Sequence, residues 1–407
     1  KICQNCKQSF VIEAQDFDFY KKMSVPPPTW CPECRRVRRG QFRNEWSFFK
    51  RPCDLCRAEI ISIYSADTLF PVYCDKCYWS DSLAPLSFGQ EYDFSKPFFE
   101  QFKELSAKVP RIAIMNRESV DSPYTHLSSN NKNCYFLVES SFNQSLHYGY
   151  WMQQSKDSID NAFGTSSELC YETIGVFNSY NLKFSEECFD CSESWFLKNC
   201  TDCHNCFGSI NLKHKKYYFL NQEYSKEEYE KKLKELALDT HEGVEKARKL
   251  VDDFYKKYPH RYAEIINSPG STGNYITNSK NCRDTFYAFK AEDSRFALHI
   301  LENIKDCYDI DTAGLNGSLL YEAMNTAISV ERMLFTNRCW TGHDVYYSEN
   351  LDNSENCFGS ISLKKGSYCI LNKQYTKEEY QELLPRIIAH MKEMQYKNDR
   401  EQVFSYG

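Results

Sequence analysis

The sequence lacks several features that would assign it to a common class of protein. No run approaches the roughly 20 consecutive apolar residues that a membrane helix needs, so we expect no membrane partner. There is no P-loop, no GxGxxG after a strand and no GxSxG nucleophile motif, and the nine histidines form no HxxxH pair. We therefore expect no nucleotide-binding or hydrolase chemistry of these kinds, and no small-molecule substrate.

Cysteine, by contrast, is abundant. The chain has 20 cysteines, and the first eight form four CxxC pairs near its start. This spacing suits metal ligation rather than disulfides, because a CxxC turn directs two thiolates at one point. Metal-bound thiolates and many unpaired thiols are typical of a reducing compartment, which predicts a cytoplasmic protein.

The four pairs predict about two Zn²⁺ ions per chain, each held by four thiolates in a closed tetrahedral site. Such sites stabilise small domains and leave no open position for catalysis. Sequential pairing is favoured because each gap then holds a strand-like run, "FVIEA" or "EIISIY". Pairing of the second and third CxxC also fits and stays open. The predicted ligands are Cys3, Cys6, Cys31, Cys34, Cys53, Cys56, Cys74 and Cys77.

A basic island follows the second CxxC, although the whole chain has a net charge of −6. One interpretation is contact with the phosphates of RNA or DNA, with Trp30, Phe42 and Trp46 available for base stacking. The other is that the cations offset the thiolate charge. The predicted nucleic-acid-binding residues are Arg35, Arg36, Arg38, Arg39, Arg43, Lys50, Arg51 and Arg57.

Two stretches resemble known sequences. "CQNCKQSF…PPPTWCPECRRVRR" resembles the probable zinc-ribbon domain of uncharacterised bacterial proteins, over about the first 40 residues. "NCFGSINLKHKKYYFLNQEYSKEEY" is similar to an element of uncharacterised candidate-phyla bacterial proteins that recurs as duplicated modules. The resemblance implies a zinc-binding N-terminus and gives no activity.

The second half of the chain contains an internal duplication. "CFGSINLKHKKYYFLNQEYSKEEY" starting at Cys206 matches "CFGSISLKKGSYCILNKQYTKEEY" starting at Cys357, and the match extends upstream with few gaps. We infer two copies of one module. The predicted organisation is tandem zinc ribbons (1–85), a helical linker region (86–123), copy 1 (124–236), a helical connector and linker (237–271), copy 2 (272–390) and a tail (391–407).

Each copy has a finer repeat, with a period in the low twenties. Short apolar runs such as "CYFLVE" and "YETIGVF" alternate with Asn, Ser and Asp corners, which predicts a parallel β-solenoid with one coil per period. An irregular β-sandwich is the rival. Capping boxes at Ser225/Glu228 and Thr376/Glu379 predict a capping helix after each solenoid, and "NSPGSTGN" reads as the linker between copies. The predicted fold is mainly β with small α content.

A second cysteine cluster lies in copy 1, at Cys188, Cys191, Cys200, Cys203 and Cys206. Alone it resembles a third metal site. In copy 2, however, Gly342, Leu351 and Ser354 replace three of these five residues. We therefore interpret these cysteines as residues at interior positions and corners of the solenoid. A third metal site is the lesser alternative.

Only one pair of residues suggests catalysis. Asp309 and Asp311 are two apart, so on a strand they share a face, and a carboxylate pair on a β-helix can cleave glycans. Copy 1 keeps at most one of them. We therefore predict a non-enzymatic, zinc-stabilised binding protein that contacts RNA, a ribosome or another nucleoprotein through its basic ribbon region. The alternative is a structural or assembly protein whose solenoid contacts a protein partner, and a carbohydrate-active enzyme ranks behind both.

Overall fold

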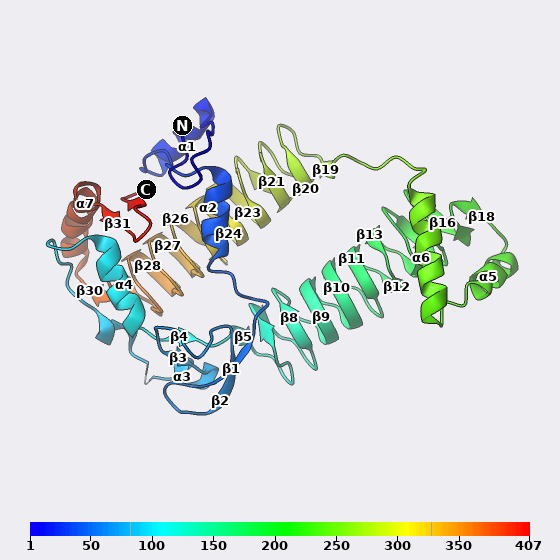
Figure 1. Ribbon diagram of the computed structural model, residues 1–407, viewed down its shortest axis with the longest axis horizontal. Helices are drawn as coiled ribbons and strands as arrows, with labels where there is room; N and C mark the ends of the chain where they lie inside the picture. Colours follow the sequence, from blue (N-terminus) through cyan, green and yellow to red (C-terminus); the bar gives the residue numbers. More distant parts are fainter. Residues whose placement is uncertain (82, 327) are drawn as a thin grey trace.

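The computed structural model describes residues 1–81, 83–326 and 328–407. Two parallel β-solenoids form most of the molecule, and an N-terminal region with most of the short helices packs against them (Figure 1). The prediction of a duplicated parallel β-solenoid with capping helices is confirmed. Among the described residues, no helix combines the length and apolar content needed to cross a bilayer.

Each coil is shorter than the sequence suggested. Strands β9 (Gln144–Gln153) and β10 (Lys156–Thr165) pair in parallel with Lys156 beside Gln144, so one coil takes 12 residues. Three successive coils of the second solenoid take 13, as where Leu298 pairs with Asp311. The repeat in the low twenties therefore spans two coils, and the expectation of one coil per period was wrong.

Within a coil, every third residue points inward. Cys134, Leu137, Ser140 and Asn143 are all at most 2% exposed, and the residue before each next inward position has a positive φ, as at Phe136 with φ 56°. A left-handed conformation costs a non-glycine residue about 1 kcal/mol. Hydrogen bonds from inward side chains to the backbone help to offset it: Ser140 Oγ donates to Val138 O at 2.8 Å and accepts from Met152 N at 3.0 Å.

Solenoid 1 (residues 116–216) and solenoid 2 (residues 265–370) have the following strands. Solenoid 1 contains β5 (Asn116–Arg117), β6 (Thr125–His126), β7 (Ser128–Ser129), β8 (Tyr135–Val138), β9, β10, β11 (Tyr171–Phe177), β12 (Tyr180–Lys183), β13 (Glu186–Phe189), β14 (Ser192–Trp195), β15 (Thr201–His204) and β16 (Lys213–Lys216). Solenoid 2 contains β19 (Ile265–Ile266), β20 (Gly273–Thr277), β21 (Thr285–Phe289), β22 (Ala291–Glu292), β23 (Leu298–Tyr308), β24 (Asp311–Tyr321), β25 (Met324–Thr326), β26 (Val330–Leu334), β27 (Trp340–Tyr346), β28 (Asp352–Phe358) and β29 (Ser367–Ile370). Because β19 pairs with β20, "NSPGSTGN" lies inside the first coil of solenoid 2 and is not a free linker.

Helices cover the C-terminal end of each solenoid. Both predicted capping boxes are present, at Ser225/Glu228 and Thr376/Glu379. Helix α6 (His241–Tyr255) packs Val251 with solenoid 1, and α7 (Lys377–Glu393) packs Ile387 with solenoid 2. The elements at these ends are β17 (Tyr218–Phe219), β18 (Gln222–Glu223), α5 (Lys226–Glu235) and α6 (His241–Tyr255) after solenoid 1, and β30 (Lys373–Gln374), α7 (Lys377–Glu393), β31 (Tyr396–Lys397) and β32 (Val403–Phe404) after solenoid 2.

The two solenoids lie side by side, and the coils of one are stacked in the opposite order to the coils of the other. Glu139 accepts a hydrogen bond from Thr312 at 3.2 Å. One coil further, Trp151 stacks on His299, and beyond it Phe163 stacks on Tyr287 with ring centroids 4.5 Å apart. Residue numbers therefore rise along solenoid 1 as they fall along solenoid 2.

The N-terminal region lies over solenoid 2 and reaches the junction with solenoid 1 (Figure 1). Trp46 contacts Tyr150 of solenoid 1, and Phe98 contacts Phe358 of solenoid 2. The elements of this region are α1 (Ala14–Lys22), α2 (Pro32–Gly40), β1 (Phe49–Pro52), β2 (Glu59–Ser62), β3 (Val72–Tyr73), α3 (Asp75–Trp79), the 3₁₀ helix η1 (Pro85–Phe88), α4 (Phe98–Lys108) and β4 (Arg111–Ile112).

Candidate metal centres and the arginine helix

The eight N-terminal cysteines form two compact groups. Site 1 holds Cys3, Cys6, Cys31 and Cys34, and site 2 holds Cys53, Cys56, Cys74 and Cys77. Within each group all four sulfur atoms lie within 4.8 Å of one another. This is the sequential grouping, and each group can hold a metal ion.

Both sites are built in the same way. The first CxxC of each forms a turn closed by a residue with positive φ, Lys7 in site 1 and Arg57 in site 2, whose N–H donates to the carbonyl of the first cysteine. The second CxxC begins a helix, with Cys31 at the N-cap of α2 and Cys74 at the N-cap of α3. Of the expected strands between the pairs, "EIISIY" contains β2, whereas "FVIEA" leads directly into α1.

Backbone N–H groups stabilise one thiolate in each site. The N–H of Cys31 donates to Cys3 Sγ at 3.2 Å, and that of Cys74 donates to Cys53 Sγ at 3.3 Å. Burial raises the pKa of both thiols, but these and neighbouring N–H groups outweigh it and lower the pKa of Cys3 to about 6 and that of Cys53 to about 7. One thiolate that forms near neutral pH in each group would give a thiophilic divalent metal its first ligand.

The cysteines of copy 1 are arranged differently. Among the described residues, only sites 1 and 2 bring four thiols together in this way. Cys188, Cys191, Cys200, Cys203 and Cys206 each occupy an inward position of a coil, at most 1% exposed. Their thiols donate to carbonyl oxygens of the backbone, for example Cys200 to Lys198 O at 3.4 Å. The CxxC spacing here reflects the inward period of three, so Cys191 and Cys203 are interior residues and not corners as expected.

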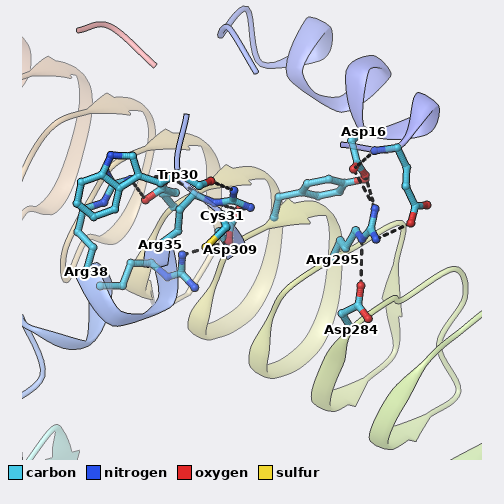
Figure 2. Close-up of polar contacts among 12 residues, drawn as sticks. Asp16, Trp30, Cys31, Arg35, Arg38, Asp284, Arg295 and Asp309 are labelled. Atoms are coloured by element: carbon cyan, nitrogen blue, oxygen red, sulfur yellow. Dashed lines mark hydrogen bonds and ion pairs between the residues drawn. The ribbon is translucent and has the colours of Figure 1, made fainter. Parts of the chain in front are cut away.

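The basic island contains an arginine helix, α2, that packs onto solenoid 2 (Figure 2). Arg35 is 1% exposed and contacts the carboxylate of Asp309 at 2.8 Å. Arg39 contacts Asp309 at 3.3 Å and Asp311 at 2.6 Å, and Arg38 pairs with Glu322. Burial raises the pKa of Glu322, but the nearby arginines outweigh it and the net shift is downward.

These contacts bear on two predictions. Arg35, Arg38 and Arg39 are engaged by carboxylates of the same chain, so they are not free to contact nucleic-acid phosphates. Asp309 and Asp311 are 0% and 5% exposed and bound to arginine, so they are not an accessible acid–base pair for glycan cleavage. The two sets of residues, about 270 positions apart, neutralise each other.

The other five residues of the basic island fall into two groups, one of residues that are buried or half-buried and one of exposed residues. Arg43 contacts Glu45 and Glu139 at 2.6 Å each, and Arg51 contacts Asp54 at 2.8 Å with its own side chain 4% exposed. These two residues also bind within the chain. Arg36 and Arg57 expose 59% and 73% of their side chains, and Lys50 is exposed. These three are the most exposed of the eight predicted residues.

A second group of ion pairs anchors helix α1. Here the polarity is reversed, because the arginine belongs to the solenoid: Arg295 contacts Asp16 at 2.9 Å and Glu13 at 2.9 Å. The hydroxyl of Tyr308 donates to Asp16 at 3.1 Å. Figure 2 shows Arg295 and Asp16 beside the arginine helix. Sequence reasoning missed Asp16, Arg295 and Glu322, because nothing in the local sequence distinguishes them from ordinary surface charges.

The module around site 2 contacts both solenoids through aromatic rings. The guanidinium of Arg117 lies 4.5 Å from the ring centroid of Trp79 and 5.1 Å from that of Trp340. The ammonium of Lys364 lies 4.5 Å from the ring centroid of Trp79 on α3, two residues after the candidate ligand Cys77.

Neither a scan against protein-family models nor a search of curated proteins finds a match to this chain. The function is therefore inferred from these contacts.

Proposed function

We propose that the protein is a non-enzymatic scaffold in which two zinc ions hold the N-terminal region against a pair of solenoids. This region, which carries both cysteine groups and the elements α1 to β4, is called the brace below. The observation that carries this proposal is the set of buried ion pairs between α2 and solenoid 2. Cys31 and Cys34 begin the helix, and Arg35 and Arg39 follow within its next two turns. A metal ion at site 1 would fix the start of this helix and so hold its arginines over Asp309 and Asp311.

Zinc is the metal that the donor sets favour. Four thiolates suit Zn²⁺, which needs neither a redox partner nor a geometry other than tetrahedral. With all four positions filled by cysteine, the ion would stabilise the fold and not act on a substrate. Both sites lie next to contacts with solenoid 2, so each ion would stabilise the junction between the N-terminal region and the solenoid as well as its own module.

The partner of this scaffold is proposed to be a protein that contacts the outer surface of the solenoids. Exposed apolar side chains are distributed over solenoid 1, with Phe142, Tyr148 and Ile174 between 47% and 58% exposed. The RNA or ribosome contact predicted from the sequence loses much of its support, because five of its eight residues are buried or half-buried in ion pairs with carboxylates of the chain.

Metal analysis and chelation test the proposal. We expect two zinc ions per chain in the purified protein. A strong chelator should remove them, lower the melting temperature, and make residues 41–48 between the two sites accessible to protease while the solenoids stay resistant. A full-length protein that loses both ions with no change in melting temperature or cleavage would contradict the brace.

RNA binding is tested separately, through the residues that stay exposed. We expect the Arg36→Gln, Lys50→Gln, Arg57→Gln triple variant to bind RNA no more weakly than the wild type. If phosphates are bound, the variant should instead lower the slope of log K against log salt by about 2 to 3. That result would restore the nucleic-acid function and leave the metal brace in place.

A further inference from the structure

A column of buried polar side chains lies on solenoid 2 where it faces the rest of the molecule. Its members occupy the same place in successive coils, as the strand register shows, and each has a positive φ. They are His299, Asn325, Arg338 and Asn350, which are buried, and Thr312, which is half-buried. Buried polar atoms in proteins are almost always hydrogen-bonded. Here His299, Asn325, Arg338 and Asn350 each have a buried atom without a partner.

Arg338 stands out because it carries a charge. Its side chain is 1% exposed, and its polar contact is a 3.2 Å hydrogen bond from Nη1 to the hydroxyl of Tyr64. Among the described residues, no carboxylate lies within 4.0 Å of its guanidinium. The other two arginines that are less than 2% exposed, among the described residues, each have a carboxylate within this distance. Arg35 contacts Asp309 at 2.8 Å, and Arg111 contacts Glu349 at 2.9 Å. A buried charge without a counter-charge is strongly unfavourable.

A small cavity of about 20 Å³ lies beside this guanidinium, between the module of site 2 and solenoid 2. Arg338 and Trp340 both line it, and Arg338 Nε and Trp340 Nε1 are buried donors without a partner. The other charged groups of its lining are Arg117, Lys364 and Asp352, and Asp352 is already paired with Arg117 at 3.4 Å. The lining thus has three cations and one carboxylate.

A third unpartnered donor belongs to His126, which contacts a residue of the cavity lining. The backbone N–H of Met115, which lines the cavity, donates to His126 Nδ1 at 3.1 Å. The neutral ring therefore carries its hydrogen on Nε2, and this atom is also buried without a partner. The unpartnered atoms at Arg338, Trp340 and His126 are donors, and Asn350 Oδ1 is the one unpartnered acceptor among the described lining residues. Donors therefore outnumber acceptors beside a buried cation, so the group that completes this region should accept hydrogen bonds and carry negative charge.

We propose that the cavity binds a single small monoanion of the size of chloride, which accepts hydrogen bonds from Arg338 Nε and Trp340 Nε1. A volume of this order holds about one particle of the size of water, so phosphate and carboxylate ligands are too large. A water molecule would accept one or two hydrogen bonds but would leave the guanidinium uncompensated. A halide supplies both the acceptor and the charge, and joins the site 2 module to solenoid 2.

Bromide locates the site directly, because it scatters anomalously and resembles chloride. Crystals of the full-length protein grown in sodium bromide should show an anomalous peak in this cavity, within hydrogen-bond distance of Arg338 Nε and Trp340 Nε1. Density there without an anomalous signal would identify a water molecule and overturn the proposal. An empty cavity would overturn it as well.

Thermal unfolding in solution provides a second test of the anion site. At constant ionic strength, replacing sodium gluconate with sodium bromide should raise the melting temperature of the wild type in a saturable way. Trp340→Phe keeps the ring but removes the donor, and should raise the half-saturating bromide concentration about ten-fold. Arg338→Met should abolish the saturable response, whereas the control Arg332→Met, at an arginine with a 46% exposed side chain paired with Asp344, should keep it. An equal response in wild type and Trp340→Phe would refute the proposal even if Arg338→Met does not fold.

Discussion

Replacing Asp309 by asparagine tests how strongly the arginine helix is held. Asp309 is fully buried and accepts hydrogen bonds from Arg35 Nε at 3.0 Å and Arg39 Nη1 at 3.3 Å. Asparagine keeps one acceptor oxygen but directs an amide donor at two guanidinium groups, and it removes the charge that compensates them. Breaking one partner of a buried ion pair costs about 3–5 kcal/mol. We expect Asp309→Asn to lower the free energy of unfolding by that amount.

The assay is urea denaturation followed by tryptophan fluorescence, with Glu33→Gln as the matched control. Glu33 lies on the same helix and pairs with Arg36 at 2.6 Å, but both side chains are more than half exposed. Exposed pairs contribute about 0–1 kcal/mol. The two carboxylate substitutions should therefore differ by at least about 2 kcal/mol. If Asp309→Asn costs no more than Glu33→Gln, burial of these ion pairs does not hold the brace, and the proposed scaffold loses its main support.

Three further predictions follow from the same geometry. Arg39→Met and Asp311→Asn, made singly and together, should show a coupling free energy of about 2 kcal/mol in a double-mutant cycle; additive effects would show that the 2.6 Å contact is not formed. Cys34→Ser should remove one of two metal ions, whereas Cys203→Ser should keep both, because Ser354 takes its place in copy 2; metal loss in Cys203→Ser, measured by elemental analysis, would restore the third site. Burial and the charge of Arg43 lower the pKa of His299 from 6.5 to about 3. Below pH 6.5 the unfolded chain binds a proton that the folded chain does not, so wild type should lose about 2 kcal/mol more than His299→Phe between pH 7 and pH 5. Parallel pH profiles would contradict this.

Features that depend on a few neighbouring residues could be read from the sequence. The CxxC turns and the capping boxes at Ser225 and Thr376 are local, because each is completed within three or four residues. The duplication was visible because both copies must fill the same interior positions. The 12-residue coil was missed because its inward residues are Ser, Cys, Asn and Gly as often as Leu or Val, so hydrophobicity shows no period of three.

The sequence by itself thus determined the eight thiols, the repeated module and the solenoid class, because turns and stacked coils are made of short-range contacts. The tertiary structure decided what the charges do. Arg35 and Asp309 are 274 residues apart, and no local pattern tells a phosphate-binding arginine from one that enters a buried ion pair. That distinction depends on desolvation and on which carboxylate the fold brings within 3 Å, so it became visible only once α2 was placed on solenoid 2.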